Sequence, residues 1–143
     1  MFRVYKKPLP AFLGAVAGGF FIDLDHVIDY FFAFGSKLNL NQFFKGMQFL
    51  ESDRMYLLFH GWEYVVLIAV IACFLKNKIF KIFLLALSLA AFVHLCTDIA
   101  INEGMSVKGY SIVYRAKSNF EIEKIVTPEH YVDHMKRKME LEN

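Results

Sequence analysis

The sequence predicts an all-α fold: a small membrane-embedded helical bundle with three main spanning helices plus interfacial amphipathic helices. The first observation behind this prediction is composition. Of 143 residues, 57% are hydrophobic and 16 are phenylalanine, and the mean hydropathy is +0.39. A soluble domain of this size cannot bury so much apolar surface, so the excess is expected to face lipid. The second observation is that the apolar residues gather in three long segments separated by polar turns.

The length of the chain predicts one domain, residues 1–143, with a helical core over 4–101 and an interfacial or soluble tail over 102–143. The net charge of +2 provides no extended basic surface, so we expect no nucleic-acid partner. The basic N-terminus followed by an apolar run also resembles a signal peptide. Its apolar stretch before a possible cleavage point is too short, however, so we expect a retained first helix.

The first helix is expected over residues 4–22. Two prolines lie in its opening turns, where a missing N–H costs least. Gly14 and Gly18 have the GxxxG spacing that lets another helix pack closely. The apolar run over 9–22 is shorter than the roughly 20 residues of a full span, so the helix is expected to carry Asp23 to the far edge of the membrane.

Residues 27–54 are expected to connect the first two spanning helices. Apolar residues recur at helical spacing over 40–50, with polar residues between them, which is typical of an amphipathic helix on the bilayer surface. Such a helix is either a lid over a site or a structural strap, and we favour the strap. The second spanning helix is expected over 55–75 and the third over 79–101, joined by a tight basic turn.

The tail changes in character. Residues 109–126 have an amphipathic pattern that suits either a helix or a strand. A Thr-Pro pair then provides the N-cap and first position of a polar helix over 127–141. His130 and His134 are four residues apart on this helix, which is also a metal-ligand spacing, but the helix is polar, so we expect them on a solvated surface.

The ionisable residues of the three apolar segments are predicted to lie at one depth. His60 and His94 are each 17 residues from Asn77, so in a helical hairpin both lie roughly 25 Å from the turn. Asp23 and His26 lie at about the same distance from the basic N-terminal end of the first helix. Basic residues gather at that end and at the turn, which the positive-inside rule assigns to the cytoplasm. We therefore expect a multi-pass protein of the cell membrane whose polar cluster faces the non-cytoplasmic side.

This cluster has the composition of a metal site. The predicted ligands are Asp23, Asp25, His26, His60, Glu63, His94 and Asp98. Imidazole nitrogens and carboxylate oxygens together suit Zn²⁺ most, and also Mn²⁺ or Fe²⁺, and this set could hold one or two ions. Asp25 or Glu63 is the expected general base if it is not a ligand. Any single His–Asp pair is better explained as a local ion pair, but three such groups at one depth favour a metal.

These residues carry a family resemblance. Residues 18–26 resemble the glycine-then-aspartate "PDxDH" signature of the membrane-bound, metal-dependent hydrolase family that includes LexA-regulated inner-membrane proteins. Residues 58–63 resemble its second histidine motif, and residues 94–98 are similar to its His-x-x-x-Asp motif. Ile22 stands where the family usually has proline, and Gly61 where it often has Arg or Ser. The resemblance implies an all-helical relative of the zinc-dependent phospholipases C, in which the seven residues serve as ligands or base.

We therefore expect a membrane-embedded metal-dependent hydrolase that cleaves a phosphodiester, such as a phospholipid headgroup bond, with membrane lipid as its partner. The alternative is a non-catalytic metal- or proton-binding membrane module or transport subunit. An open coordination position with a groove to lipid favours the enzyme, whereas a closed set of ligands favours the alternative.

Overall fold

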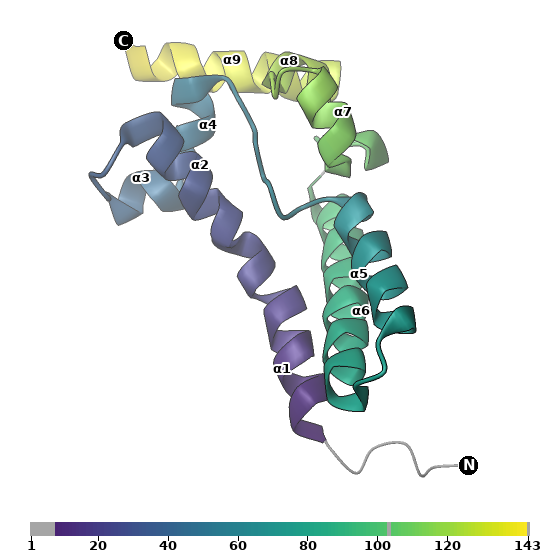
Figure 1. Cartoon of the computed structure of the whole chain (residues 1–143). Helices are drawn as coiled ribbons and strands as arrows, with labels where there is room; N and C mark the ends of the chain where they lie inside the picture. Colours follow the sequence, from purple (N-terminus) through teal and green to yellow (C-terminus); the bar gives the residue numbers. More distant parts are fainter. Residues whose placement is uncertain (1–7, 103, 143) are drawn as a thin grey trace.

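Helices form nearly all of the regular structure in the computed structural model, which describes residues 8–102 and 104–142 (Figure 1). Within these residues no β-strand forms, and only two isolated bridges occur, one of which joins Arg54 to Glu121. The expected all-α fold is thus confirmed. The part of the first predicted helix over residues 4–7 lies outside the described residues.

The N-terminal arm consists of α1 (Pro8–Gly19), the short 3₁₀ helix η1 (Phe21–Asp23) and α2 (Leu24–Phe34). Figure 1 shows them following one another in a single direction. The connector was expected from residue 27, and that expectation is wrong, because α2 continues to Phe34 and stops at Gly35, where φ is +67°. The carboxylates of Asp25 and Asp29 on α2 are buried, so this helix is part of the folded core.

The predicted surface helix over 40–50 is instead two short helices, α3 (Leu40–Phe44) and α4 (Met47–Ser52). Gly46 separates them with a left-handed φ of +68°, a conformation that glycine adopts without strain. Helix α4 packs against α2 and also contacts the C-terminal helix. The segment is therefore braced between two other elements, as expected of a strap.

The other long element is an antiparallel hairpin of α5 (Trp62–Phe74) and α6 (Lys78–Ile101). Asn77 caps α6 by accepting hydrogen bonds from the first-turn N–H groups. Among the described residues, two helical segments are long and apolar enough to cross a membrane, 8–34 and 78–101. Helix α5 begins seven residues later than expected and, at 13 residues, is only about 20 Å long, so three full spans are not established.

Helix α1 packs along α6 through the two glycines of the GxxxG motif. Gly14 and Gly18 are both buried. A Cβ at Gly14 would overlap the backbone oxygen of Phe83, and a Cβ at Gly18 would overlap that of Leu87. The close backbone approach expected from the spacing is therefore confirmed, and it holds η1 beside the C-terminal half of α6.

The tail folds over the end of the bundle opposite the α5–α6 turn (Figure 1). Its elements are η2 (Val107–Tyr110), α7 (Ile112–Lys117), α8 (Ile122–Ile125) and α9 (Pro128–Glu142). Thr127 caps α9 as expected, since its Oγ1 accepts a hydrogen bond from the N–H of His130. The buried Tyr110 joins a hydrophobic core with residues of η1, α5 and α6, so the tail closes over the region where those elements meet.

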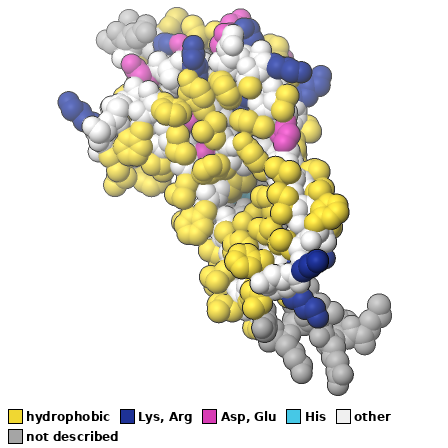
Figure 2. All heavy atoms as spheres, in the orientation of Figure 1, with side chains coloured by type: hydrophobic (Ala, Val, Ile, Leu, Met, Phe, Trp, Pro, Cys, Tyr) yellow, Lys and Arg dark blue, Asp and Glu magenta, His cyan; other side chains and the backbone are white. Residues whose placement is uncertain are grey.

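Figure 2 shows hydrophobic side chains covering the narrow shaft of the molecule, whereas charged side chains gather toward its two ends. Only 22% and 17% of the most apolar stretches of 8–34 and 78–101 are buried within the chain. The core helix of a soluble protein would be mostly buried, so these helices leave an unusually large apolar surface uncovered.

Candidate metal centre

Four side chains from three separate segments meet at one point. Asp23 lies in η1, His60 in the loop before α5, and His94 and Asp98 one turn apart on α6. The Oδ1 atom of Asp23 is 3.3 Å from Nε2 of His60 and 3.2 Å from Nε2 of His94. The Oδ2 atom of Asp98 is 3.4 Å from each of the same two nitrogens. The predicted convergence at one depth is thus present.

These four N···O distances are those between ligands of one small cation. A tetrahedral ion with bonds of about 2.0–2.1 Å separates its ligand atoms by roughly 3.3–3.4 Å. The observed range of 3.2–3.4 Å matches this separation. Two overlapping triplets of these side chains could each hold a metal ion, His60 with His94 and Asp98, and His60 with Asp23 and His26.

His60 and His94 each turn a nitrogen without a hydrogen-bond partner in the described structure toward the place where the four side chains meet. Although the carboxylate oxygens are within ion-pair distance, the Nε2 atoms of His60 and His94 are buried and have no hydrogen-bond partner among the described residues. Their other nitrogens are engaged, with Nδ1 of His60 2.9 Å from Oδ2 of Asp25 and Nδ1 of His94 3.1 Å from the backbone oxygen of Gly19. With both acceptors on the Nδ1 side, the proton belongs on Nδ1 and the Nε2 lone pairs face the centre, as metal-binding histidines require.

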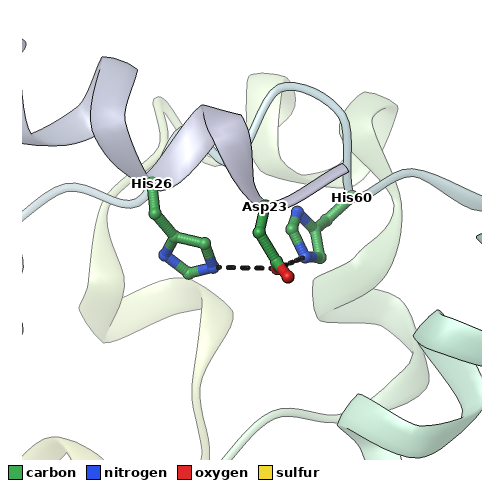
Figure 3. Close-up of side chains that lie close together, drawn as sticks. All are labelled: Asp23, His26 and His60. Carbon is green, nitrogen blue, oxygen red and sulfur yellow. Dashed lines mark ion pairs between the residues drawn. The ribbon is translucent and has the colours of Figure 1, made fainter. Parts of the chain in front are cut away.

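His26 lies at the edge of the same cluster. It is one turn after Asp23, and its Nε2 is 3.9 Å from Oδ1 of that carboxylate. Figure 3 shows the Asp23 carboxylate between the rings of His26 and His60, and the centroids of these two rings are 5.3 Å apart. His26 is half-buried, and it lies close enough to Asp23 and His60 to share an ion with them, so it remains a candidate ligand at the edge of the four-atom group.

The loop that carries His60 is held by two buried carboxylates of α2. Oδ2 of Asp25 accepts hydrogen bonds from the N–H groups of Phe59 and His60, at 2.7 and 3.2 Å. Oδ2 of Asp29 accepts from the N–H groups of Tyr56 and Leu57, at 3.0 and 3.3 Å. These bonds satisfy the N–H groups of the segment without a helix, and the left-handed φ of Leu57 interrupts any helix through it, which explains the late start of α5.

Arg115 holds the same loop from its other side. The guanidinium is completely buried and donates to the backbone oxygens of Leu57 and His60, at 2.7 and 2.9 Å, and to that of Gly109. Leu57 has a left-handed φ of +40°, which is strained for a leucine. Its N–H and its carbonyl are both bound, so the surrounding contacts can maintain this strain. Burial lowers the pKa of Arg115, and the nearby carboxylates of Asp25 and Asp29 oppose that change.

The structure separates two of the predicted ligands from the four-atom group. Asp25 is fully buried on the far side of His60, where it binds Nδ1 and two backbone N–H groups. Glu63 accepts hydrogen bonds from the Ser111 hydroxyl and from the N–H of Ile112, which places it at the N-terminus of α7. His60 and Glu63 were expected on one helix face, and this is wrong because His60 precedes the N-cap of α5.

Two residues that orient the site were missed as functional residues. Asp29 carried a signal, since it follows Asp25 by four residues, the spacing that places both on one face of a helix. Arg115 carried only the weaker signal of a single arginine between apolar residues in the tail. Their partners in the loop that carries His60 lie 27 or more residues away in the sequence, so no local pattern reveals these contacts.

The cluster opens into two hollows. A cavity of about 220 Å³ is bordered by His26, His60 and Asp98 on one side and by tail residues, including His130, on the other. A more open depression of about 330 Å³ lies beside Asp23 and His26 and reaches the aromatic side chains of α3. The side chain of Asp23 is itself 50% exposed, so the four-atom group is accessible from outside.

The two tail histidines differ in their surroundings. His134 was expected on a solvated surface, but it is buried, with Nε2 3.0 Å from Oδ1 of Asp53, and this ties α9 to the end of α4. Burial acts to raise the pKa of Asp53, but the hydrogen bonds from His134 and Lys138 outweigh it, so the pKa is below its ordinary value. His130 is exposed, as expected.

No family model matches the chain, and no curated protein or solved structure is similar to it. The assignment of the site therefore depends on its own geometry: four donor atoms at ligand spacing, two of them buried nitrogens without a hydrogen-bond partner in the described structure, and an opening to the outside.

Proposed function

We propose that this protein is a membrane-embedded, metal-dependent hydrolase that cleaves a phosphodiester, such as a phospholipid headgroup bond. The observation that carries the proposal is the four-atom group of Asp23, His60, His94 and Asp98, whose spacing fits one tetrahedral ion. Zn²⁺ suits this mixture of imidazole and carboxylate best, and Mn²⁺ or Fe²⁺ are the other candidates.

The membrane setting is supported by two helices of sufficient length and hydropathy and by their largely uncovered apolar surface. A hydrocarbon environment would explain why so many phenylalanine and leucine side chains of α1, α5 and α6 are exposed. The basic turn at one end of the shaft favours a cytoplasmic position for that end. On this orientation the cluster and the tail would face the non-cytoplasmic side.

A divalent ion held by these four residues would supply Lewis acidity, which polarises a phosphoryl oxygen and activates water for attack. The chain's own residues then determine orientation and proton transfer. Asp25 and Arg115 fix the loop of His60, and Gly19 fixes the ring of His94. These contacts hold both imidazoles in place before a substrate arrives, so little reorganisation is needed during the reaction.

His26 is the residue best placed to move a proton. Water adds to phosphorus as the bond to the leaving oxygen breaks, and the proton that water loses must reach that oxygen. The predicted bases are engaged elsewhere, Asp25 with His60 and Glu63 with α7. His26 borders both the cavity and Asp23, and histidine exchanges protons near neutral pH.

The opening of the cluster favours an enzyme over a non-catalytic metal module. Structural metal sites are closed by four protein ligands, whereas catalytic sites leave one position of the ion to water or substrate. With four protein ligands, the enzyme therefore requires that the exposed Asp23 gives way to substrate or that the ion takes a fifth ligand. Here Asp23 is half exposed and two hollows reach the donor atoms.

The test is hydrolysis of a phospholipid in mixed micelles, followed by release of its phosphorylated headgroup, with parent protein and a His26→Gln variant. We expect the variant to keep its metal and lose most of its turnover, since general acid–base catalysis contributes about 10²–10⁴-fold. Asp133→Asn, on the exposed face of α9, is the matched control and should retain full activity. A metal-loaded parent without turnover would support the non-catalytic alternative.

A further inference from the structure

An apolar groove runs between α1 and α5. Its volume is about 620 Å³, within the usual range for small-molecule sites. Phe21 and Ile22 form one wall, Phe59 and Ile68 the other, and Leu87 of α6 lies at the base. None of its lining residues is charged, and its few polar groups include the hydroxyl of Tyr64. The groove therefore suits a hydrocarbon ligand along its length.

The groove lies beside the metal-binding cluster. Ile22 precedes Asp23, and Phe59 precedes His60, so two residues that line the groove are directly followed by residues of the cluster, although no cluster residue lines the groove itself. Phe21 and Phe59 are 50% and 44% exposed, which leaves the groove open along the side of the shaft. An exposed apolar groove and a polar, metal-binding cluster thus lie next to each other on the molecule.

We propose that this groove holds one acyl chain of a membrane phospholipid whose phosphate group reaches the cluster. The headgroup half of this proposal rests on the proposed function, whereas occupation of the groove by an acyl chain can be measured without turnover. A phospholipid fits both parts of the surface, because its hydrocarbon lies along the apolar walls and its anionic phosphate meets the imidazoles and their cation.

A membrane-spanning helix of a partner protein would fit the groove and the cluster less well than a phospholipid. It could cover the apolar walls, but a spanning helix has no anionic group to offer at its end unless its sequence supplies one. The groove is also lined by residues of α1 and α6, both in segments suited to span a membrane, so it would lie at the depth of lipid acyl chains.

The test is photo-crosslinking in phosphatidylglycerol vesicles that contain a small fraction of phosphatidylglycerol with a diazirine in its acyl chain. The adducts are mapped by mass spectrometry in the unsubstituted protein. We expect them to concentrate at Phe21 and Phe59, relative to Leu89 and Val93, which are at least as exposed on α6 but lie outside the groove. Adducts spread evenly over both pairs would overturn the proposal.

A matched pair of variants tests the same point. Ala17→Trp places a large side chain in the groove, whereas Ala15→Trp places it on an exposed part of α1 outside the groove. We expect the first variant to lose most of the adducts at Phe59 and the second to retain them. Unchanged adducts in a folded Ala17→Trp variant would contradict an acyl-chain site.

Hydrolysis and metal content, measured on the same preparations, separate this proposal from the proposed function. Adducts concentrated in the groove of a protein that has no turnover would support the acyl-chain site and remove the hydrolase. Turnover together with evenly spread adducts would leave the hydrolase in place and overturn the acyl-chain site.

Discussion

Replacement of Asp25 by asparagine distinguishes a residue that orients a ligand from a residue that is one. The side chain is completely buried, and its Oδ2 binds Nδ1 of His60 at 2.9 Å and two backbone N–H groups. In Asp25→Asn the amide oxygen can replace Oδ2, so the loop can keep its shape. The carboxylate that fixes the proton on Nδ1 and raises the basicity of Nε2 is lost.

Loss of such a carboxylate partner typically weakens metal affinity 10–100-fold, which corresponds to about 1.4–2.7 kcal/mol. We expect Asp25→Asn to fall in this range in a chelator-competition titration at neutral pH. Asp133→Asn, which changes an exposed carboxylate paired with Lys136, should bind metal as the parent does. Unchanged affinity in Asp25→Asn would refute the orienting role, and complete loss of metal would identify Asp25 as a direct ligand.

Three further variants test the fold around the site. Gly18→Ala would force α1 away from α6 and should lower the free energy of unfolding by about 1–3 kcal/mol. Its control is Gly19→Ala, which should change stability by less than about 0.5 kcal/mol because no atom lies within 4 Å of the added methyl group in the described structure. Thermal unfolding in detergent compares the two variants, and equal stability would contradict the packing of α1 on α6. Arg115→Lys keeps the charge but not the planar guanidinium, and should lower both the unfolding temperature and the metal affinity. Each hydrogen bond lost to the loop should cost roughly 1.5–3 kcal/mol of stability. An unchanged metal affinity would count against the role of Arg115 in holding the loop. Asp53 has a pKa below its ordinary 3.8, so its stabilising effect is complete above that value and is lost as pH falls below it. Because its side chain is about half exposed, Asp53→Asn should cost only about 0.5 kcal/mol at pH 7, and the difference from the parent should shrink under acid; a difference that grew as the pH fell would reverse the assigned sign.

The long helix over 78–101 and the meeting of its polar residues with those of other segments could be predicted from the sequence. Counting residues from Asn77 placed His60 and His94 at one depth, and their ring centroids are 5.3 Å apart. The count succeeded although α5 starts later than expected, because only His60 and Gly61 at one end of that path, and Leu75 and Lys76 at the other, lie outside the helix. A small error in the helix boundary changes depth by only a few ångströms.

The same error in the start of α5 had a larger effect on the direction in which its neighbouring side chains point. Residues three apart share a face only when both are helical, so His60 and Glu63 point to different partners once the helix begins at Trp62. Helix α2 was missed because its acidic residues resemble those of a solvated connector. Asp25 and Asp29 are instead buried and bind backbone groups from a loop far along the chain. Such pairings depend on tertiary structure, which a single sequence does not display.

The central claim is that Asp23, His60, His94 and Asp98 together bind one divalent ion. The most direct test is metal analysis of the purified parent protein beside a His60→Ala/His94→Ala variant, after equal exposure to Zn²⁺ and removal of loosely bound ions. We predict a stoichiometric ion in the parent and none in the variant, because two of the four ligands are gone. Equal metal content in the two proteins would contradict the claim.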